Sequence, residues 1–163
     1  MTLITSTIGT PFGDMSLLGT PESLHVAAFT SDVDGLRDRL QSTLRNEPIR
    51  RGDSSAAAAL RAYFAGDIDA LSTVAVNQPG GPFHAKVWAA MREVPPGTTV
   101  SYAELAARAG EPRAVRAAGS ACARNAICLF VPCHRIVRSD GSLGGYYYGL
   151  DTKRRLLEHE RGH

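Results

Sequence analysis

Two short segments between residues 101 and 125 carry strong start and stop signals for helices. Ser101 and Glu104 have the S-x-x-E spacing of a capping box, which predicts that a helix begins in "SYAELAARAG". Gly110 is a suitable end for that helix, and Pro112 can occupy the first turn of a second one in "EPRAVRAAGSACARN". Two short helices joined by a glycine-containing turn predict a helix-turn-helix.

The second of these helices is unusually bare, in the sense that most of its side chains are small. Small residues fill most of it, with arginines between them: Ala114, Ala117, Ala118, Gly119, Ser120 and Ala121, with Arg113, Arg116 and Arg124. A smooth, basic helix can approach another backbone closely. The same small residues would also permit close helix packing inside the protein, so composition alone leaves both interpretations open.

The N-terminal part of the chain has a residue pattern typical of strands rather than of short helices. Residues 2–29 are rich in Thr, Ile, Leu and Val and are broken at "GTPFGD" and "GTPES", which predicts two or three short antiparallel strands. Leu36, Leu40 and Leu44 then recur at helical spacing. The stretch "SSAAAALRAYFAG" predicts another helix, capped by a serine and ended by Gly66.

A domain boundary is expected where these patterns stop. "LSTVAVNQPGGP" has no helical period and ends in a Pro-Gly cluster, so we divide the chain into domains 1–78 and 79–163. Pro82 can then start a helix with one apolar face, and "ICLFV" predicts a buried strand followed by the glycine-rich loop "SDGSLGGYYYG". Asp151 is the expected cap of a last helix with Leu156 and Leu157 directed inward. The fold class is therefore α+β, with strands and helices in a small first domain and a mostly helical second domain.

Charge and cysteine content narrow the class of protein. The net charge of the 163 residues is +2, but 12 of the 18 basic residues and only 7 of the 16 acidic ones follow residue 80, so the second domain is the one suited to a polyanion. Three cysteines form no even disulfide framework, which favours a reducing compartment. With no apparent leader and no apolar run long enough to span a membrane, we expect a soluble cytoplasmic protein.

One cysteine stands out from the other two. Cys122 and Cys128 lie in apolar or alanine-rich surroundings and are expected to be inert. Cys133 lies in "PCHR", followed by His134 and Arg135, and nearby positive charge or a histidine network lowers the pKa of a thiol. A reactive thiol is expected there.

Adjacency alone does not couple a thiol to an imidazole, because successive side chains of an extended segment point to opposite faces. A bridging water or a turn at Pro132 would connect them, and a carboxylate from Glu158 or Glu160 would orient His134. A Cys-His pair without a second pair of ligands matches no zinc spacing, so no metal is expected.

These motifs together resemble a known family. "PFHAKVW", "VPPGTTVSYAELAARAGEPRAVRAAGSACARN", "PCHRI" and "GSLGGYYYGLDTKRRLLEHE" resemble the O6-alkylguanine-DNA alkyltransferases, also called methylated-DNA-protein-cysteine methyltransferases, without a gap from Pro82 to Glu160. The resemblance implies direct-reversal repair. Such a protein binds double-stranded DNA, flips out O6-alkylguanine, with O4-alkylthymine as a second candidate, and transfers the alkyl group irreversibly to its own cysteine. It implies a monomer without a cofactor, leaving cooperative loading on DNA open.

The resemblance also implies roles for individual residues. Cys133 would be the alkyl acceptor, His134 its base through a water molecule, and Glu160 the group that orients the histidine. Tyr102 would crowd the target phosphate and donate to the base ring. Asn125 would join the DNA-contacting helix to the active site.

DNA contact and base recognition would come from neighbouring segments. The helix-turn-helix would enter the minor groove, and its narrowness would explain the bare helix. Arg116 would fill the space left by the flipped base. Other DNA contacts would come from Ala114, Val115, Ala117, Gly119 and Ser120, and the base pocket from the backbone at Cys133, Ile136 and Tyr147 with the side chains of Tyr146 and Tyr148.

Three positions depart from the family pattern. Ala126 stands where proline is usual, Tyr147 and Tyr148 stand where small residues are common, and the first half has no zinc-binding cysteines. Two other classes of protein share some of the features: a helix-turn-helix regulator with a redox-sensing cysteine, and a Cys-His hydrolase that turns over many times.

Overall fold

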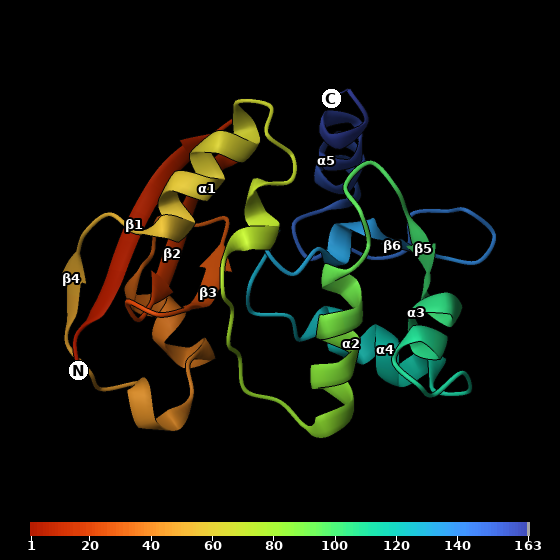
Figure 1. Cartoon of the computed structure of the whole chain (residues 1–163), viewed down its shortest axis with the longest axis horizontal. Helices are drawn as coiled ribbons and strands as arrows, with labels where there is room; N and C mark the ends of the chain where they lie inside the picture. Colours follow the sequence, from red (N-terminus) through yellow and green to blue (C-terminus); the bar gives the residue numbers. More distant parts are fainter. Residues whose placement is uncertain (163) are drawn as a thin grey trace. The chain divides into compact units, whose positions relative to one another are not determined.

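The computed structural model describes residues 1–162 (Figure 1). The chain forms two compact units: Met1–Pro79 together with Ala126–Phe130, and Gly80–Asn125 together with the residues from Val131 onward. The single boundary predicted after residue 78 lies one residue before the change between the units at Pro79 and Gly80. It does not describe the later segment 126–130, which returns to the first unit.

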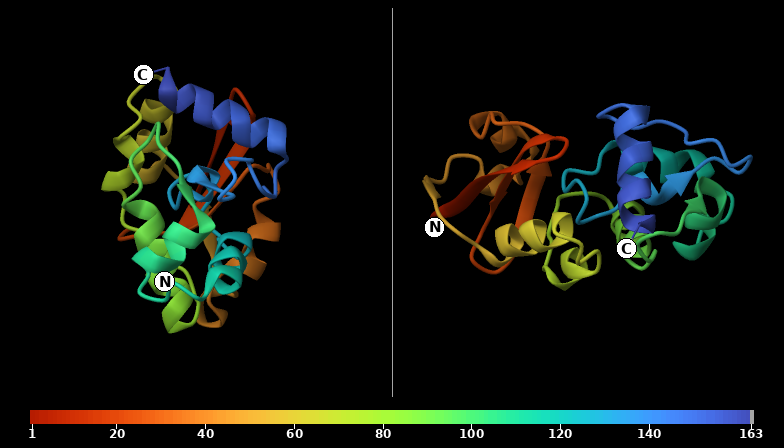
Figure 2. Two further views of the ribbon diagram at one scale, coloured as in Figure 1. Left: turned by 90° about the vertical axis from the view of Figure 1, so that its right-hand side faces the viewer. Right: turned by 90° about the horizontal axis from the view of Figure 1, so that it is seen from above.

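The first unit is built on a four-stranded mixed sheet in the order β3-β2-β1-β4. The strands are β1 (Leu3–Thr10), β2 (Gly13–Gly19), β3 (Leu24–Ala28) and β4 (Ile49–Arg51). The first three pair antiparallel, as expected for residues 2–29, whereas β4 joins β1 in parallel. Helix α1 (Ser55–Phe64) lies along one face of this sheet (Figure 2).

Of the two helices predicted in the first unit after the strands, one is present and the other is not. The Ser54 hydroxyl accepts a hydrogen bond from the backbone NH of Ala57, which confirms the serine cap. The helix expected from the spacing of Leu36, Leu40 and Leu44 was wrong. Two 3-10 turns, η1 (Asp34–Arg39) and η2 (Ser42–Leu44), replace it. Leu36 and Leu40 are buried without a continuous helix between them, and the two aspartates and the glycine of η1 favour turns. A further 3-10 turn, η3, spans Ala70–Thr73.

The segment expected to be the strand "ICLFV" is mostly a turn. Ile127 makes a single bridge to Ala27 at the free edge of β3, where the backbone NH of Cys128 also donates to the Ala27 carbonyl at 3.0 Å. Leu129 then has φ of 70°, which ends any extended run. The residues are buried as expected, but the sequence pattern cannot separate a buried turn from a buried strand.

The second unit holds the remaining helices. They are α2 (Pro82–Arg92), α3 (Tyr102–Arg108), α4 (Val115–Ala123) and α5 (Leu150–Arg161). A small parallel pair links β5 (Val100–Ser101) to β6 (Ile136–Val137), and the 3-10 turn η4 (Cys133–Arg135) precedes β6. The Ser101 hydroxyl accepts from the NH of Glu104 at 3.0 Å, which confirms the predicted start of α3.

Two predicted helix starts were wrong by a few residues. Pro112 does not open α4, because the NH of Ala114 donates to the Glu111 carbonyl and residues 111–114 form a turn with proline at its second position. Asp151 does not cap α5. The helix begins at Leu150, two residues earlier than a cap at Asp151 implies, after Gly149 at φ of 97°, and Asp151 instead pairs with Arg154 within the first turn. Within residues 1–162, no helix combines the length and apolar character needed to cross a membrane.

Candidate active site

The predicted reactive cysteine lies in a tight turn. After Pro132, Cys133–Arg135 form the 3-10 turn η4, with the Arg135 NH donating to the Pro132 carbonyl at 3.0 Å. The side chains of Cys133 and His134 therefore do not point to opposite faces, as they would in an extended segment. Successive residues of a 3-10 helix are one third of a turn apart. A turn at Pro132, one of the two connections considered from the sequence, is present. It leaves Cys133 half-buried and His134 fully buried.

His134 is held by a carboxylate from the last helix. Its Nε2 lies 2.8 Å from Oε2 of Glu160, and both side chains are inaccessible to solvent. Of the two carboxylates considered, Glu160 is therefore the partner, while Glu158 is exposed. Because an ionised carboxylate can only accept, Nε2 carries the ring proton and Nδ1 has the free lone pair. Nδ1 is buried and has no hydrogen-bond partner within the described chain.

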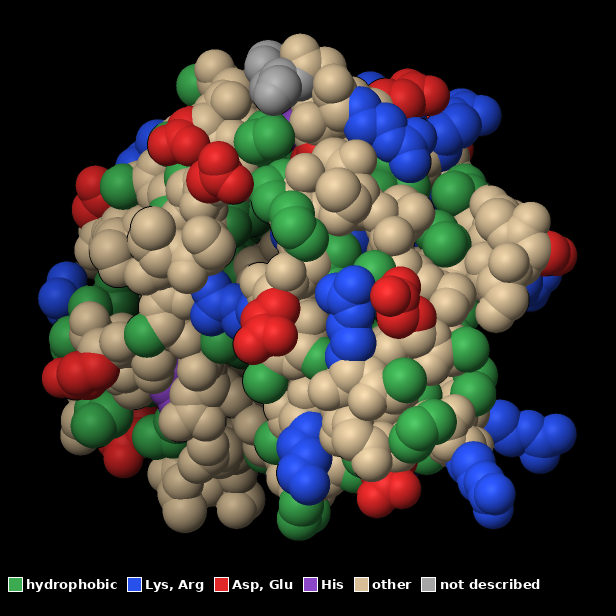
Figure 3. Space-filling view, turned by 45° about the vertical axis from the view of Figure 1, so that its right-hand side comes forward, with side chains coloured by type: hydrophobic (Ala, Val, Ile, Leu, Met, Phe, Trp, Pro, Cys, Tyr) green, Lys and Arg blue, Asp and Glu red, His purple; other side chains and the backbone are tan. Residues whose placement is uncertain are grey.

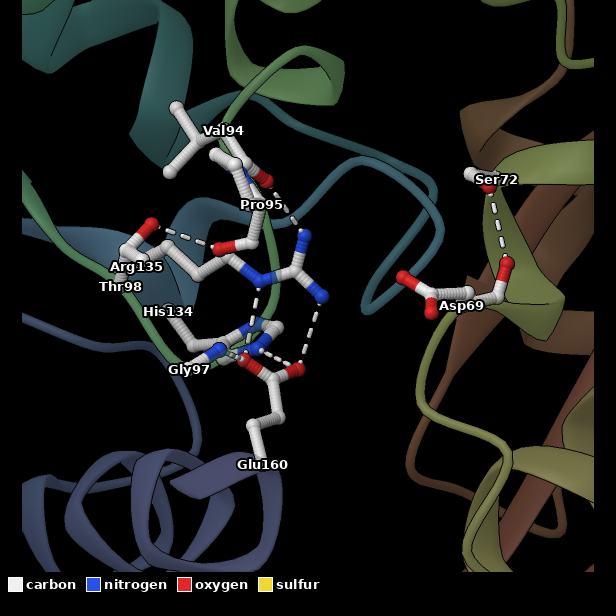
Figure 4. A network of polar contacts seen from close by, with 9 residues as sticks. All are labelled: Asp69, Ser72, Val94, Pro95, Gly97, Thr98, His134, Arg135 and Glu160. Atoms are coloured by element: carbon white, nitrogen blue, oxygen red, sulfur yellow. Dashed lines mark hydrogen bonds and ion pairs between the residues drawn. The ribbon is translucent and has the colours of Figure 1, made fainter. Parts of the chain in front are cut away.

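Glu160 is shared with Arg135, a contact that the sequence did not indicate (Figure 4). The guanidinium binds both carboxylate oxygens, Nε to Oε1 at 2.9 Å and Nη2 to Oε2 at 2.8 Å, and its Nη1 donates to the Val94 carbonyl at 2.8 Å. Burial alone would raise the pKa of Glu160, but His134 and Arg135 outweigh burial and hold that pKa well below its usual range. Glu160 is thus a permanent anion.

The electrostatics favour a neutral imidazole and a protonated thiol in the resting protein. Burial lowers the pKa of His134, against the opposing effect of Glu160. Burial also raises the pKa of Cys133, although a hydrogen bond from Asn125 and the charge of Lys153 lower it. The expectation that neighbouring charge gives Cys133 a low pKa was wrong, because burial has the largest effect on this thiol and raises its pKa. A base must therefore remove the thiol proton.

Asn125 connects α4 to this turn. It follows the end of α4, where its backbone NH donates to the Cys122 carbonyl at 3.3 Å. Its side-chain amide donates to the Val131 carbonyl at 2.8 Å and also binds the Cys133 thiol. Asn125 therefore contacts both the end of α4 and the turn that carries Cys133, and its role in linking them stays a prediction.

Tyr102 lies at the start of α3, beside the glycine-rich loop. Gly144 has φ of 73°, and a Cβ there would lie 3.1 Å from Cε2 and 3.2 Å from the hydroxyl of Tyr102, so only glycine lets the loop backbone pass the ring this closely. Burial, then Cys122 and Cys133, raise the pKa of Tyr102 to about 12. The phenol therefore stays protonated and can act as a donor.

Helix α4 has a side that packs inward and a side that is exposed. Ala118 and Ala121 are buried, and the indole of Trp88 donates to the Ala121 carbonyl at 2.9 Å, so these two alanines serve internal packing. Gly119 differs, because a Cβ built there would meet no atom within 4 Å. Val115 and Arg116 are exposed. Arginine and lysine side chains also stand out from the surface in the space-filling view (Figure 3).

The three tyrosines of the loop form an edge-to-face series. The ring of Tyr148 lies 5.8 Å from that of Tyr146 and 5.0 Å from that of Tyr147. Tyr147 is 81% exposed, whereas Tyr146 and Tyr148 are half-buried. Tyr147 therefore points to solvent, and Tyr148 packs between its two neighbours.

One further buried group was missed from the sequence. Lys153 of α5 has no solvent exposure, and it lies at helical spacing with Leu156, Leu157 and Glu160. Reading this four-residue stripe as one inward face would have identified Lys153 as buried. No cluster of three or more metal-binding side chains occurs within residues 1–162.

Comparison with known proteins identifies the family of this chain. The family model described as "6-O-methylguanine DNA methyltransferase, DNA binding domain" matches residues 82–162. The methylated-DNA-protein-cysteine methyltransferase of Methanosarcina barkeri is 44% identical over 155 residues, 94% of each chain. The bifunctional transcriptional activator and DNA repair enzyme Ada of Escherichia coli is 48% identical over 88 residues, which are 54% of this chain but 25% of Ada.

A solved structure covers both units. The crystal structure of Mycobacterium tuberculosis OGT in complex with DNA has a TM-score of 0.80 and 33% identity, over 98% of this chain and 93% of that one. With relatives of this identity aligned over nearly their whole length, the chain belongs to the methylated-DNA-protein-cysteine methyltransferase family of DNA repair enzymes.

Proposed function

We propose that this protein repairs O6-alkylguanine in double-stranded DNA by transferring the alkyl group to Cys133, once per molecule. The observation that carries the proposal is the buried Glu160–His134 pair adjoining Cys133 in one tight turn, with a neutral imidazole whose Nδ1 is free to accept a proton. Matching relatives whose names state the same activity support it.

The reaction is a displacement at a saturated carbon. The Cys133 proton passes to Nδ1 of His134, through a water molecule in the mechanism implied by the family. The resulting thiolate forms the S–C bond as the C–O6 bond breaks. Glu160 stabilises the imidazolium that forms. The Tyr102 phenol donates to the base ring as negative charge develops on the departing guanine. The thioether product is not hydrolysed, so the acceptor is used up.

Recognition is assigned to α4 and the glycine-rich loop. In this proposal α4 enters the minor groove through Ala114, Val115, Ala117, Gly119 and Ser120, and Arg116 occupies the space of the flipped base. The open space above Gly119 and the exposure of Arg116 support this orientation. The backbone at Cys133, Ile136 and Tyr147 and the ring of Tyr146 would bind the base, with Tyr148 beside them.

The cell compartment and assembly belong to the same proposal. All three cysteines are free, which suits the reducing cytoplasm, and we propose that a monomer acts there. O4-alkylthymine is a second candidate substrate.

Intact-protein mass after incubation with an oligonucleotide containing O6-methylguanine tests the function. We expect a gain of one methylene per protein molecule, located on Cys133 by peptide mapping. The gain should be lost in Cys133→Ser and kept in the matched control Cys122→Ser. Release of product over many turnovers would indicate a hydrolase instead, and no mass gain in the wild type would refute the proposal.

A further inference from the structure

Residues 126–130 leave the second unit for a short distance and belong to the first. The backbone NH of Ala27 in β3 donates to the Ala126 carbonyl at 3.0 Å, which anchors this segment to the sheet. The residues that flank the segment are joined to each other, because the Asn125 amide donates to the Val131 carbonyl at 2.8 Å. The segment is therefore a closed loop whose two ends are held together.

The backbone NH of Ala126 has an acceptor that lies far away in the sequence. It donates at 2.8 Å to Oε1 of Gln78, which is 48 positions earlier and belongs to the same unit. Ala126 is 8% exposed, and Gln78 is half-buried. A buried NH without an acceptor is destabilising, so this contact restrains the backbone of Ala126. The restraint acts at the first residue after Asn125.

Gln78 is itself held by its position beside β3. It follows Val76, which forms a parallel bridge to Leu24 of β3, and the NH of Asn77 donates to the Leu24 carbonyl at 2.9 Å. The backbone on the N-terminal side of Gln78 is therefore fixed to the sheet. From there its side chain reaches the segment that begins at Ala126.

The residue before Ala126 contacts the proposed alkyl acceptor. The Asn125 amide binds the Cys133 thiol as well as the Val131 carbonyl. A side chain keeps a precise direction when the groups around it are held by their own contacts, and the nearest such restraint in the chain is the one on Ala126. The direction of the Asn125 amide therefore depends on the contact between Ala126 and Gln78.

We propose that Gln78 is a positioning residue for alkyl transfer. Its side-chain carbonyl holds the NH of Ala126, and this contact keeps the Asn125 amide on the Cys133 thiol. The inference rests on the proposed function and adds to it a residue of the first unit.

The alanine at position 126 is what makes this contact possible. Proline is usual there in the family, and proline has no NH to donate, while its ring fixes φ at about −65°. A ring and a hydrogen bond are two different ways to restrain the same backbone position. Proline at position 126 should therefore make Gln78 dispensable, which gives the inference a specific test.

Four variants isolate the contact. Gln78→Met keeps a side chain of similar length but removes the acceptor, whereas Gln78→Glu keeps an oxygen that accepts from the NH. Ala126→Pro removes the donor, and its combination with Gln78→Met completes a double-mutant cycle. Asn77→Ala is the matched control, because Asn77 is the neighbouring amide, is exposed and contacts Gln41 instead. Thermal unfolding shows whether each variant is folded.

Three measurements compare these variants with the wild type. In Gln78→Met, methyl transfer from O6-methylguanine DNA should slow about 10-fold, which is less than the roughly 10²-fold loss for a displacement of about 1 Å. The amide hydrogen of Ala126 should exchange about 10-fold faster.

The third measurement is the pH profile of Cys133 alkylation by iodoacetamide, with the label located by peptide mapping. In Gln78→Met this profile should shift upward, because the hydrogen bond from Asn125 lowers the pKa of the Cys133 thiol. Gln78→Glu should stay close to the wild type in all three measurements, and Asn77→Ala should match it.

The double-mutant cycle gives the sharpest result. With proline at position 126 there is no NH to satisfy, so adding Gln78→Met should change neither the transfer rate nor the iodoacetamide profile. Further slowing in that background would show that Gln78 acts by another route and would overturn the inference. Wild-type transfer by a folded Gln78→Met would also overturn it, as would slow transfer with an unchanged iodoacetamide profile.

The variants remain decisive if one of them does not fold. Without Gln78→Met, the two proline variants decide. Without a proline variant, Gln78→Met and Gln78→Glu decide, because equal transfer rates in these two would rule out a role for the acceptor oxygen. The exchange and iodoacetamide measurements use no DNA, so they test Gln78 even if the wild type gains no methyl group and the proposed function fails.

Discussion

Glu160 is the residue on which the polar network depends, because one carboxylate serves two buried basic side chains. His134 takes one contact at 2.8 Å, and Arg135 binds both oxygens. Loss of the negative charge would leave the guanidinium without its counter-ion and remove the acceptor that fixes the His134 tautomer. The basicity of Nδ1 therefore depends on a residue 26 positions away in the sequence.

Replacing Glu160 with glutamine should slow methyl transfer about 10²-fold, because the imidazolium loses its stabilising anion. Single-turnover rates measured by intact mass test this. Glu158→Gln is the matched control, since Glu158 is exposed on the same helix, and its rate should equal that of the wild type. Equal rates in both variants would show that Glu160 only supports the fold.

At the scale of the element, the residues of α4 that pack against the protein differ from those that are exposed. Ala118 and Ala121 pack inward, whereas Val115 and Arg116 are exposed and Gly119 has open space above its Cα. The small residues that composition left ambiguous therefore divide between the two interpretations. The side of α4 that packs inward needs small residues for helix contacts, and internal packing does not account for Gly119.

Substitution of Gly119 tests this division. Gly119→Ala should increase the free energy of unfolding by about 0.5–1 kcal/mol, because alanine is the better helix former and the site has space. Gly119→Leu should stay folded but bind duplex DNA more weakly, because a bulky side chain does not fit a narrow groove. Urea unfolding and fluorescence anisotropy with a labelled duplex measure the two effects. A destabilised Gly119→Ala would mean that the glycine serves internal packing.

The exposed arginine of α4 allows a comparison of two substrates. Arg116→Ala should slow repair of duplex DNA much more than reaction with free O6-benzylguanine, because only the duplex needs a side chain to replace the extruded base. Arg161→Ala, at the end of α5, is the control and should change neither rate. Equal slowing of both substrates by Arg116→Ala would make the residue structural.

At the scale of the whole molecule, each unit contains a buried histidine. His25 of β3 is 5% exposed, and its Nε2 lies 3.0 Å from the Ser23 hydroxyl, while His134 belongs to the second unit. Burial lowers the pKa of both from the ordinary value of 6.5. The folded protein therefore binds fewer protons than the unfolded chain in mildly acidic solution.

Between about pH 7.5 and 5.5, stability should accordingly fall as the pH drops through 6.5, by up to about 1.4 kcal/mol per pH unit for each histidine. His25→Gln should reduce this slope. Urea unfolding at pH 7.5, 6.5 and 5.5, followed by circular dichroism, provides the measurement. The same slope in the variant would show that His25 does not contribute.

Local sequence determined the features of this protein that depend on contacts between residues a few positions apart. The caps at Ser54 and Ser101 depend on a side chain reaching an NH three residues on, and both formed as expected. The pairing of His134 with Glu160 was also anticipated, but from resemblance to a family, since spacing alone left Glu158 as an alternative.

Tertiary structure decided the features that depend on distant groups. Residues 126–130 join the first unit because the edge of β3 offers Ala27 as a backbone partner, which no local pattern records. Arg135 binds Glu160 of the last helix, and burial, which depends on the whole fold, raises the pKa of the Cys133 thiol. Lys153 is buried because three carbonyls from two other segments converge on it. The burial and the charge compensation of a group depend on all residues that lie near it in space. Only the folded chain determines which residues these are.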